Sequence, residues 1–168
     1  SGGMAATPDG SRVYVTSGAI NELGVIDTAT DRMTLITGQP FGRLRDIAVA
    51  PDGKLAYVAT QTSNGAQGFV RVLDIDPASP TFHTIRASIP LREKSDCQRL
   101  KVRPDGRRVY ALGVDTIAEP NVSFVAEIDI DPTGVVYARF SNGADQALGQ
   151  VALSTFTNPQ GLQPQGNN

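Results

Sequence analysis

The stretch Ala48-Val-Ala-Pro-Asp-Gly-Lys-Leu-Ala-Tyr-Val-Ala-Thr60 occurs three times in this sequence with small changes. Its other copies are Ala5-Ala-Thr-Pro-Asp-Gly-Ser-Arg-Val-Tyr-Val-Thr16 and Lys101-Val-Arg-Pro-Asp-Gly-Arg-Arg-Val-Tyr-Ala111. The prolines of successive copies are 43 and 53 residues apart. Such self-similarity at a nearly fixed spacing indicates an array of similar structural units.

The Pro-Asp-Gly at the centre of each copy predicts a hairpin turn. Proline presets φ near −65°, aspartate can bond its own backbone, and glycine supplies the positive φ that closes a three-residue loop. We therefore expect turns at residues 8–10, 51–53 and 104–106.

The strand that follows each turn is apolar on both faces, as in Val13-Tyr14-Val15 and Val109-Tyr110-Ala111. This composition suits a sheet that is covered on both sides. Short strands repeated every 40 to 50 residues or so are typical of propeller blades. The sequence therefore predicts an all-β fold, a partial β-propeller of three consecutive four-stranded antiparallel blades plus an irregular C-terminal tail.

The expected strands follow the same order in each blade. They are 3–7, 12–16, 23–27 and 32–37 in the first blade, 46–50, 55–60, 69–75 and 81–87 in the second, and 99–103, 108–112, 124–130 and 135–140 in the third. The blades should span about 1–42, 43–95 and 96–143, and residues 144–168 form either a tail or the start of a truncated fourth blade.

The repeat resembles that of the YVTN-type, lactonase-like β-propellers. The resemblance rests on Thr7-Pro-Asp-Gly-Ser-Arg-Val-Tyr-Val15 and Val25-Ile-Asp-Thr-Ala-Thr30 and covers roughly residues 3 to 140. It implies a propeller fold, and this group includes binding and surface proteins as well as sugar-lactone hydrolases. Closed propellers have typically 4 to 8 blades, so we expect that the chain is a fragment or that copies associate.

Composition narrows the classes of partner. A formal net charge of −2 and a pI near 5.3 provide no basic surface for nucleic acid, and no apolar run is long enough for a membrane helix. A protein, a glycan or a small molecule is the expected partner. We expect no metal and no cofactor, because the single His83 and the single Cys97 make zinc sites and disulfides improbable. No signal peptide is recognised, and Ser1-Gly-Gly opens within a repeat, so we expect that a targeting segment is missing from this sequence. The expected location is extracytoplasmic.

Several residues could be functional, but we interpret them as structural. Asp27, Asp74 and Asp129 recur at strand ends, where a carboxylate can bond backbone N–H groups, so turn formation is preferred over a cation-binding ring. Residues 129–134 resemble the start of a calcium loop but lack its later ligands. We interpret His83 as a surface residue of an outer strand and Cys97 as a packed thiol rather than a nucleophile.

Tyr14, Tyr57 and Tyr110 repeat with the blade and are interpreted as packing between blades.

The candidate binding site lies on the face with the longer connections. These connections are 17–22, 61–68 and 113–123 within blades, and 38–45 and 88–98 between blades, whereas those on the opposite face are short. Long loops on a rigid scaffold commonly carry binding sites. The charged and polar residues that enter the inner strands there should surround the channel mouth: Arg43, Arg45, Asp46, Asp96, Gln98 and Arg99. A solvated rim with local ion pairs is the alternative interpretation.

Two functions are expected, one from the long loops and one from the resemblance to lactonase-like propellers. The favoured one is a non-enzymatic scaffold that presents the long-loop face to a protein or glycan. The alternative is a lactonase-type hydrolase, in which a metal or an Arg/Asp cluster at the mouth polarises a lactone carbonyl and activates water. Asp46, Asp96 and Gln98 are its candidate residues.

The outer faces of the first and third blades should lack neighbours. At about 25 cal/mol per Å², leaving several hundred Å² of apolar surface exposed forgoes on the order of 10 kcal/mol. We therefore expect self-association or a requirement for the remainder of the propeller.

Overall fold

The structure is a computed structural model that describes residues 2–17, 21–62, 64–116, 122–130, 136–140 and 145–146. Within these residues every regular element is a β-strand, and no helix capable of spanning a membrane occurs. The all-β prediction is confirmed.

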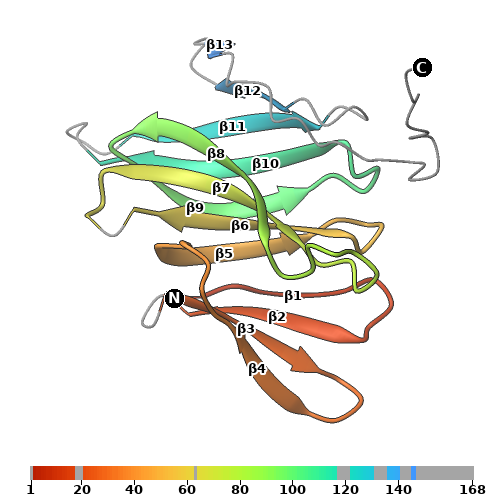
Figure 1. Cartoon of the computed structure of the whole chain (residues 1–168). Helices are drawn as coiled ribbons and strands as arrows, with labels where there is room; N and C mark the ends of the chain where they lie inside the picture. The colour runs from red at the N-terminus through yellow and green to blue at the C-terminus, as the bar shows by residue number, and fades with distance from the viewer. Residues whose placement is uncertain are drawn as a thin grey trace, which may run out of the picture.

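The strands form three antiparallel sheets that follow one another along the chain (Figure 1). Blade 1 contains β1 (Met4–Ala6), β2 (Arg12–Ser17), β3 (Glu22–Asp27) and β4 (Arg32–Ile36). Blade 2 contains β5 (Arg43–Val49), β6 (Leu55–Gln61), β7 (Gln67–Asp74) and β8 (Ile85–Glu93). Blade 3 contains β9 (Ser95–Val102), β10 (Arg108–Asp115), β11 (Ser123–Ile130), β12 (Val136–Phe140) and β13 (Asp145–Gln146).

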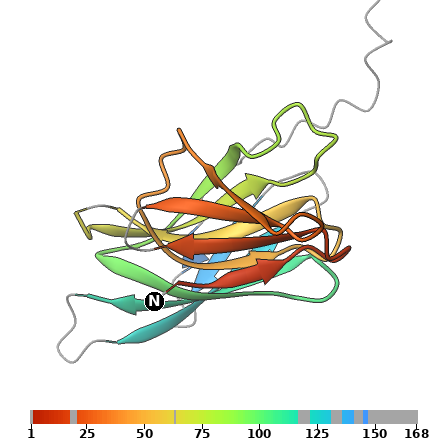
Figure 2. The same cartoon turned by 90° about the horizontal axis from the view of Figure 1, so that it is seen from below.

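The blades are stacked so that blade 2 lies between blades 1 and 3 (Figure 1), and Figure 2 views the stack from the side of blade 1. The inner strands β1, β5 and β9 run in the same direction. We call the end where they begin the long-loop end and the end with the Pro-Asp-Gly turns the turn end.

The three predicted hairpin turns are confirmed. Gly10, Gly53 and Gly106 have φ of 70°, 71° and 72°. The N–H of each glycine donates to the carbonyl three residues earlier, at 2.9 Å in every case. The left-handed glycine lets the chain enter the second strand of each blade, so the repeated phrase fixes the geometry of the turn end.

Two apolar clusters hold the blades together. Tyr14 and Val25 of blade 1 belong to a buried cluster with Val58 of blade 2. Tyr57 of blade 2 belongs to a second cluster with Val109 of blade 3. Tyr14 and Tyr57 are almost completely buried, as expected for packing between blades. Tyr110, at the corresponding position of blade 3, is only half-buried.

The outer strand of blade 2 differs from the prediction. β8 begins at Ile85 rather than at residue 81 and continues to Glu93, so residues 88–98 are not a loop. A single residue, Lys94 with φ of 52°, separates β8 from β9. Pro90 is tolerated inside β8 because β8 is an edge strand and needs fewer backbone donors.

The connection between β7 and β8, residues 75–84, is accordingly long, although a short one was predicted at this end. Hydrogen-bonded turns organise it: Ser79 N–H donates to the Asp76 carbonyl and Thr84 N–H donates to the Thr81 carbonyl, both at 3.0 Å.

Blade 3 has one strand more than predicted. β13 pairs with β12 and begins just inside the segment assigned to a tail or a fourth blade. The remainder of that segment lies outside the described residues. Residues 131–134, which resemble the start of a calcium loop, also lie outside them.

Candidate functional site

The six predicted site residues all lie near the start of β5 or β9, at the long-loop end. Arg43 pairs with Gln61 at the end of β6, and Asp96 pairs with Val114 near the end of β10. The predicted residues fall at matching places in the repeat, since Arg43 and Asp96 each precede the turn proline by eight residues.

A β-bulge interrupts each of these inner strands at the same repeat position. In β5 the register shifts between Leu44 and Asp46, which leaves Arg45 opposite no single partner. In β9 the shift leaves Gln98 in the same situation. A bulge re-aims the side chain of its extra residue, and bulges are common beside functional sites.

Both bulged residues bond the same carboxylate. Arg45 Nε and Nη2 lie 3.0 and 2.7 Å from Asp96 Oδ1 and Oδ2, which is a two-point guanidinium–carboxylate contact. Gln98 Nε2 donates to Asp96 Oδ2 at 2.6 Å. Arg45 Nη2 also donates to Gln61 Oε1 at 3.1 Å. We call Arg45, Gln61, Asp96 and Gln98 the inner-strand cluster.

The cluster is largely shielded from water. The Asp96 side chain is 9% exposed and that of Arg45 is 30% exposed. Gln61 is buried and Gln98 is half-buried. A pair that is partly removed from water interacts more strongly than an exposed one, so the cluster joins blades 2 and 3 and also fixes the guanidinium in place.

Asp46 also connects the two inner strands, although it does not belong to the cluster. Its Oδ2 accepts a hydrogen bond from the Leu100 N–H of β9 at 2.9 Å. A Cβ built on Gly3 would lie 2.0 Å from Asp46 Oδ1, so the chain before β1 passes directly over this carboxylate. Asp46 therefore has a clear structural role at the junction of the blades.

Arg43 and Arg99 are exposed and lie outside the cluster. The structure thus brings together three of the six predicted residues and leaves these two on the rim. Gln61 was not among the predicted residues. Its position as the pairing partner of Arg43 depends on the register between β5 and β6, which the sequence pattern alone does not reveal.

The recurring aspartates act as the turn interpretation predicts in two blades. Asp27 Oδ1 accepts from the N–H groups of Ala29 and Thr30 at 3.1 and 3.0 Å. Asp74 Oδ1 accepts from the Asp76 N–H at 3.1 Å. In blade 3, Asp129 pairs with Arg108 at 2.7 Å. Across the described ranges, no three potential His, Cys, Asp or Glu ligands gather at one point.

Cys97 is fully buried beside the cluster. Burial, with a smaller contribution from Asp96 and Asp46, raises the pKa of the Cys97 thiol. The thiol is therefore protonated at neutral pH, which agrees with the packed-thiol interpretation.

The interpretation of His83 as a surface residue of an outer strand is wrong. His83 lies in the connection between β7 and β8 with φ of 64°, and it is half-buried. Its Nε2 lies 3.0 Å from the Tyr14 hydroxyl of blade 1. The packing of this connection against blade 1, which the local sequence does not specify, determines its place.

Comparison with known proteins gives a fold but no sequence relative. No protein-family profile matches the sequence, and no curated protein matches it. A hydrazine synthase from Kuenenia stuttgartiensis superposes with a TM-score of 0.62 at 18% identity, over 88% of this chain and 43% of that protein. A candidate 6-phosphogluconolactonase from Bacteroides fragilis gives a TM-score of 0.63 at 15% identity, over 84% of this chain and 38% of that protein.

The periplasmic gluconolactonase of Pseudomonas aeruginosa gives a TM-score of 0.57 at 17% identity, over 82% of this chain and 38% of that protein. The chain therefore has a lactonase-like β-propeller fold, as the sequence resemblance implied, while the YVTN type of its repeat stays a prediction. It spans about two fifths of the length of these structures.

Proposed function

Proceeding from the lactonase-like propeller fold, we propose that this chain forms part of a sugar-lactone hydrolase whose substrate binds at the long-loop end. The observation that carries the proposal is the inner-strand cluster, in which two equivalent β-bulges direct Arg45 and Gln98 onto Asp96. The gluconolactonase among the similar structures supports the choice of substrate class. The hydrolase therefore replaces the non-enzymatic scaffold as the favoured function.

Arg45 supplies the electrophilic group in this proposal. Its Nε and Nη2 are held by Asp96 and Gln61, so the guanidinium keeps a fixed orientation and can offer further N–H donors to a ligand. A donor at the lactone carbonyl oxygen stabilises the negative charge that develops there when water adds to the carbonyl carbon.

Asp96 is the group that accepts a proton from the attacking water. Addition of water gives a tetrahedral intermediate, the ring C–O bond then breaks, and the ring oxygen takes up a proton to give the open hydroxy acid. Gln98 positions the Asp96 carboxylate by donating to Oδ2.

Hydrolysis of glucono-δ-lactone by the full-length protein, followed by pH-stat with and without divalent metal, tests the proposal. Asp96→Asn and Arg45→Ala should each lower kcat/KM by roughly 100-fold or more. Lys101→Ala is the matched control, because Lys101 lies in the same strand β9 and is exposed. Turnover equal to the buffer rate, or unchanged in both cluster variants, would refute the hydrolase proposal.

A non-enzymatic scaffold for a protein or glycan at the long-loop end is the second candidate. It is favoured by the contacts of Asp96, whose two oxygens are already bonded to Arg45 and Gln98. In that case the protein shows no lactone turnover, and exposed Arg43 and Arg99 contribute to binding. An extracytoplasmic location belongs to the same proposals and is supported by the periplasmic source of one similar structure.

A further inference from the structure

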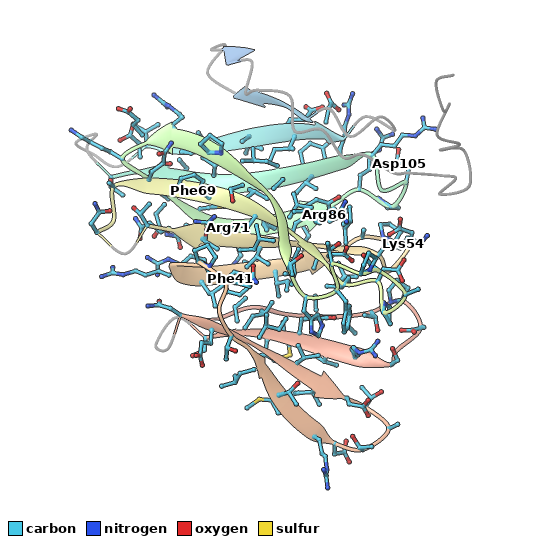
Figure 3. All side chains as sticks on the ribbon, viewed as in Figure 1. Phe41, Lys54, Phe69, Arg71, Arg86 and Asp105 are labelled. Atoms are coloured by element: carbon cyan, nitrogen blue, oxygen red, sulfur yellow. The ribbon has the colours of Figure 1, made fainter. Side chains whose placement is uncertain are left out.

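A groove at the turn end lies opposite the inner-strand cluster. It consists of two cavities of about 250 and 290 Å³ that share Asp52, Lys54 and Asp76. Figure 3 shows the labelled Lys54 and Arg86 on the turn side of the sheets, away from the labelled Phe69. Each cavity is smaller than the roughly 300–1,000 Å³ of drug-sized pockets, so the groove suits a small molecule.

The walls of the groove are held in place. The connection 75–84 forms one wall, and buried Asp74, at the end of β7, accepts hydrogen bonds from Ser79 and Thr81 of this connection at 2.6 and 2.7 Å. Arg86 completes the arrangement with an ion pair to Asp74 at 2.9 Å. A preformed wall lowers the entropic cost of ordering the protein when a ligand binds.

The same connection is anchored across the groove to blade 1. The Tyr14 hydroxyl contacts His83, and the Arg12 guanidinium lies 5.5 Å from the centre of the Phe82 ring. Blades 1 and 2 therefore keep a fixed spacing around the groove.

Two cations in the groove have donors to offer. Among the described residues, no hydrogen bond or ion pair of the Arg12 guanidinium occurs, and it lies over the Phe82 ring. Hydrogen bonds within its own turn, and to a smaller extent the charge of Arg12, lower the pKa of Asp27, the partner of Arg12 in the strand pairing. The Lys54 ammonium has one distant partner, Asp76 at 3.9 Å, and its side chain is 66% exposed. Both side chains line the first cavity, so an anionic group there can be received from two sides.

Three carboxylates line the first cavity beside the two cations, those of Asp9, Asp52 and Asp76. Each is partly occupied by its own turn, and Asp9 Oδ1 accepts from the Ser11 N–H at 3.0 Å. Asp52 Oδ1 accepts from the Lys54 N–H at 3.0 Å, and Asp76 Oδ1 accepts from the Ala78 N–H at 2.9 Å. Each ionised carboxylate has about four lone-pair sites, so acceptors remain for hydroxyl groups of a ligand.

We propose that the groove at the turn end binds a small polyhydroxylated acid, with its anionic group at Arg12 and Lys54 and its hydroxyls donating to Asp52 and Asp76. The site is separate from the proposed hydrolase site, because it lies at the other end of the strands. Its existence does not depend on lactone hydrolysis, and its test measures binding alone.

Calorimetric titration of the full protein with D-gluconate tests the site, with sorbitol as the neutral polyol and acetate as the simple acid. D-gluconate should bind with a Kd in the millimolar range or below. Arg12→Ala and Lys54→Ala should each weaken binding by about 5-fold or more, since each loses a charge-assisted hydrogen bond. Sorbitol and acetate should each bind at least 10-fold more weakly than D-gluconate.

Arg107→Ala is the matched control, because Arg107 follows the turn glycine of blade 3 as Lys54 follows that of blade 2. It should leave gluconate affinity unchanged. Because Lys54 is exposed, the Lys54→Ala variant is expected to fold normally. The melting temperatures of all variants are compared to verify this. No heat of binding at 50 mM gluconate, equal binding of sorbitol, or unchanged affinity in Lys54→Ala would overturn the proposal.

Discussion

The hydroxyl of Tyr14 lies 3.0 Å from Nε2 of His83, so a strand of blade 1 is tied to the connection that precedes the outer strand of blade 2. The two rings meet edge-on, with centroids 5.8 Å apart. Burial raises the pKa of Tyr14 to about 12. Burial, assisted by the charge of Arg12, lowers the pKa of His83 below its usual 6.5.

Stability should therefore fall as the pH decreases from 7 to 5. The His83 pKa is lower in the folded protein than in the unfolded chain, so protons bind preferentially to the unfolded chain. The stability that neutral His83 contributes is therefore lost as the pH falls below about 6.5. Urea unfolding at several pH values measures the effect. His83→Asn, which tolerates the positive φ, should flatten the slope. An equal slope in both proteins would contradict the role of His83.

Asp74→Asn should destabilise the protein by about 3 kcal/mol or more. The Asp74 side chain is 3% exposed and pairs with Arg86, so its replacement leaves a cation without its partner. Asp27→Asn is the control at the same repeat position, where the carboxylate is in an exposed turn. Its cost in urea unfolding should stay within about 1 kcal/mol. Equal costs for both variants would argue against the buried pair.

Tyr57→Ala should cost about 3–5 kcal/mol, because a fully buried aromatic side chain between blades leaves a cavity. Tyr110→Ala should cost less, since Tyr110 is only half-buried. Chemical denaturation of the two variants compares them directly. A larger loss for Tyr110 would indicate that its face is covered in the folded protein.

Gly113→Ala should cost about 1–3 kcal/mol, because the new methyl group would lie 2.3 Å from the Phe124 ring. Gly24→Ala is the matched strand glycine, and its added Cβ meets nothing closer than Met33 Sδ at 3.4 Å. Thermal unfolding should show a clear loss for the first and a small change for the second. The reverse order would show that β10 is packed differently.

The purified 168-residue chain should self-associate through the open face of blade 1. This face contains the exposed or half-exposed side chains of Val13, Val15, Ile26, Met33 and Leu35. Sedimentation at micromolar concentration measures the association, and Ile26→Lys should reduce it. A monomer that does not bind a hydrophobic dye would contradict this prediction.

The sequence predicted the hairpin turns because their chemistry is local: proline, aspartate and glycine act within one loop. The connection 75–84 could not be predicted in this way. Its Thr-Phe-His-Thr run has strand-like composition, but a hydrogen bond from Thr81 to Asp74, seven residues earlier, and the contact of His83 with Tyr14, distant in sequence, hold it as a loop.

The candidate site was predicted in part for a related reason. Arg45, Asp96 and Gln98 were predicted as site residues because they are polar residues at the entry to two inner strands on the long-loop face. The two β-bulges that bring them into contact depend on pairing register, which alternating composition does not define when both faces of a strand are covered.

Glu127 of blade 3 faces Tyr110 in the strand pairing, where blades 1 and 2 have Val25 opposite Tyr14 and Val72 opposite Tyr57. Arg108 forms an ion pair with this glutamate. A blade that covers blade 3 must therefore accommodate a bonded charge pair, whereas one that covers blade 1 meets mainly apolar side chains, with Ser17 and Glu22 at one end of that face. The two ends of the stack are thus chemically distinct, so a neighbouring blade that suits one end is not suited to the other.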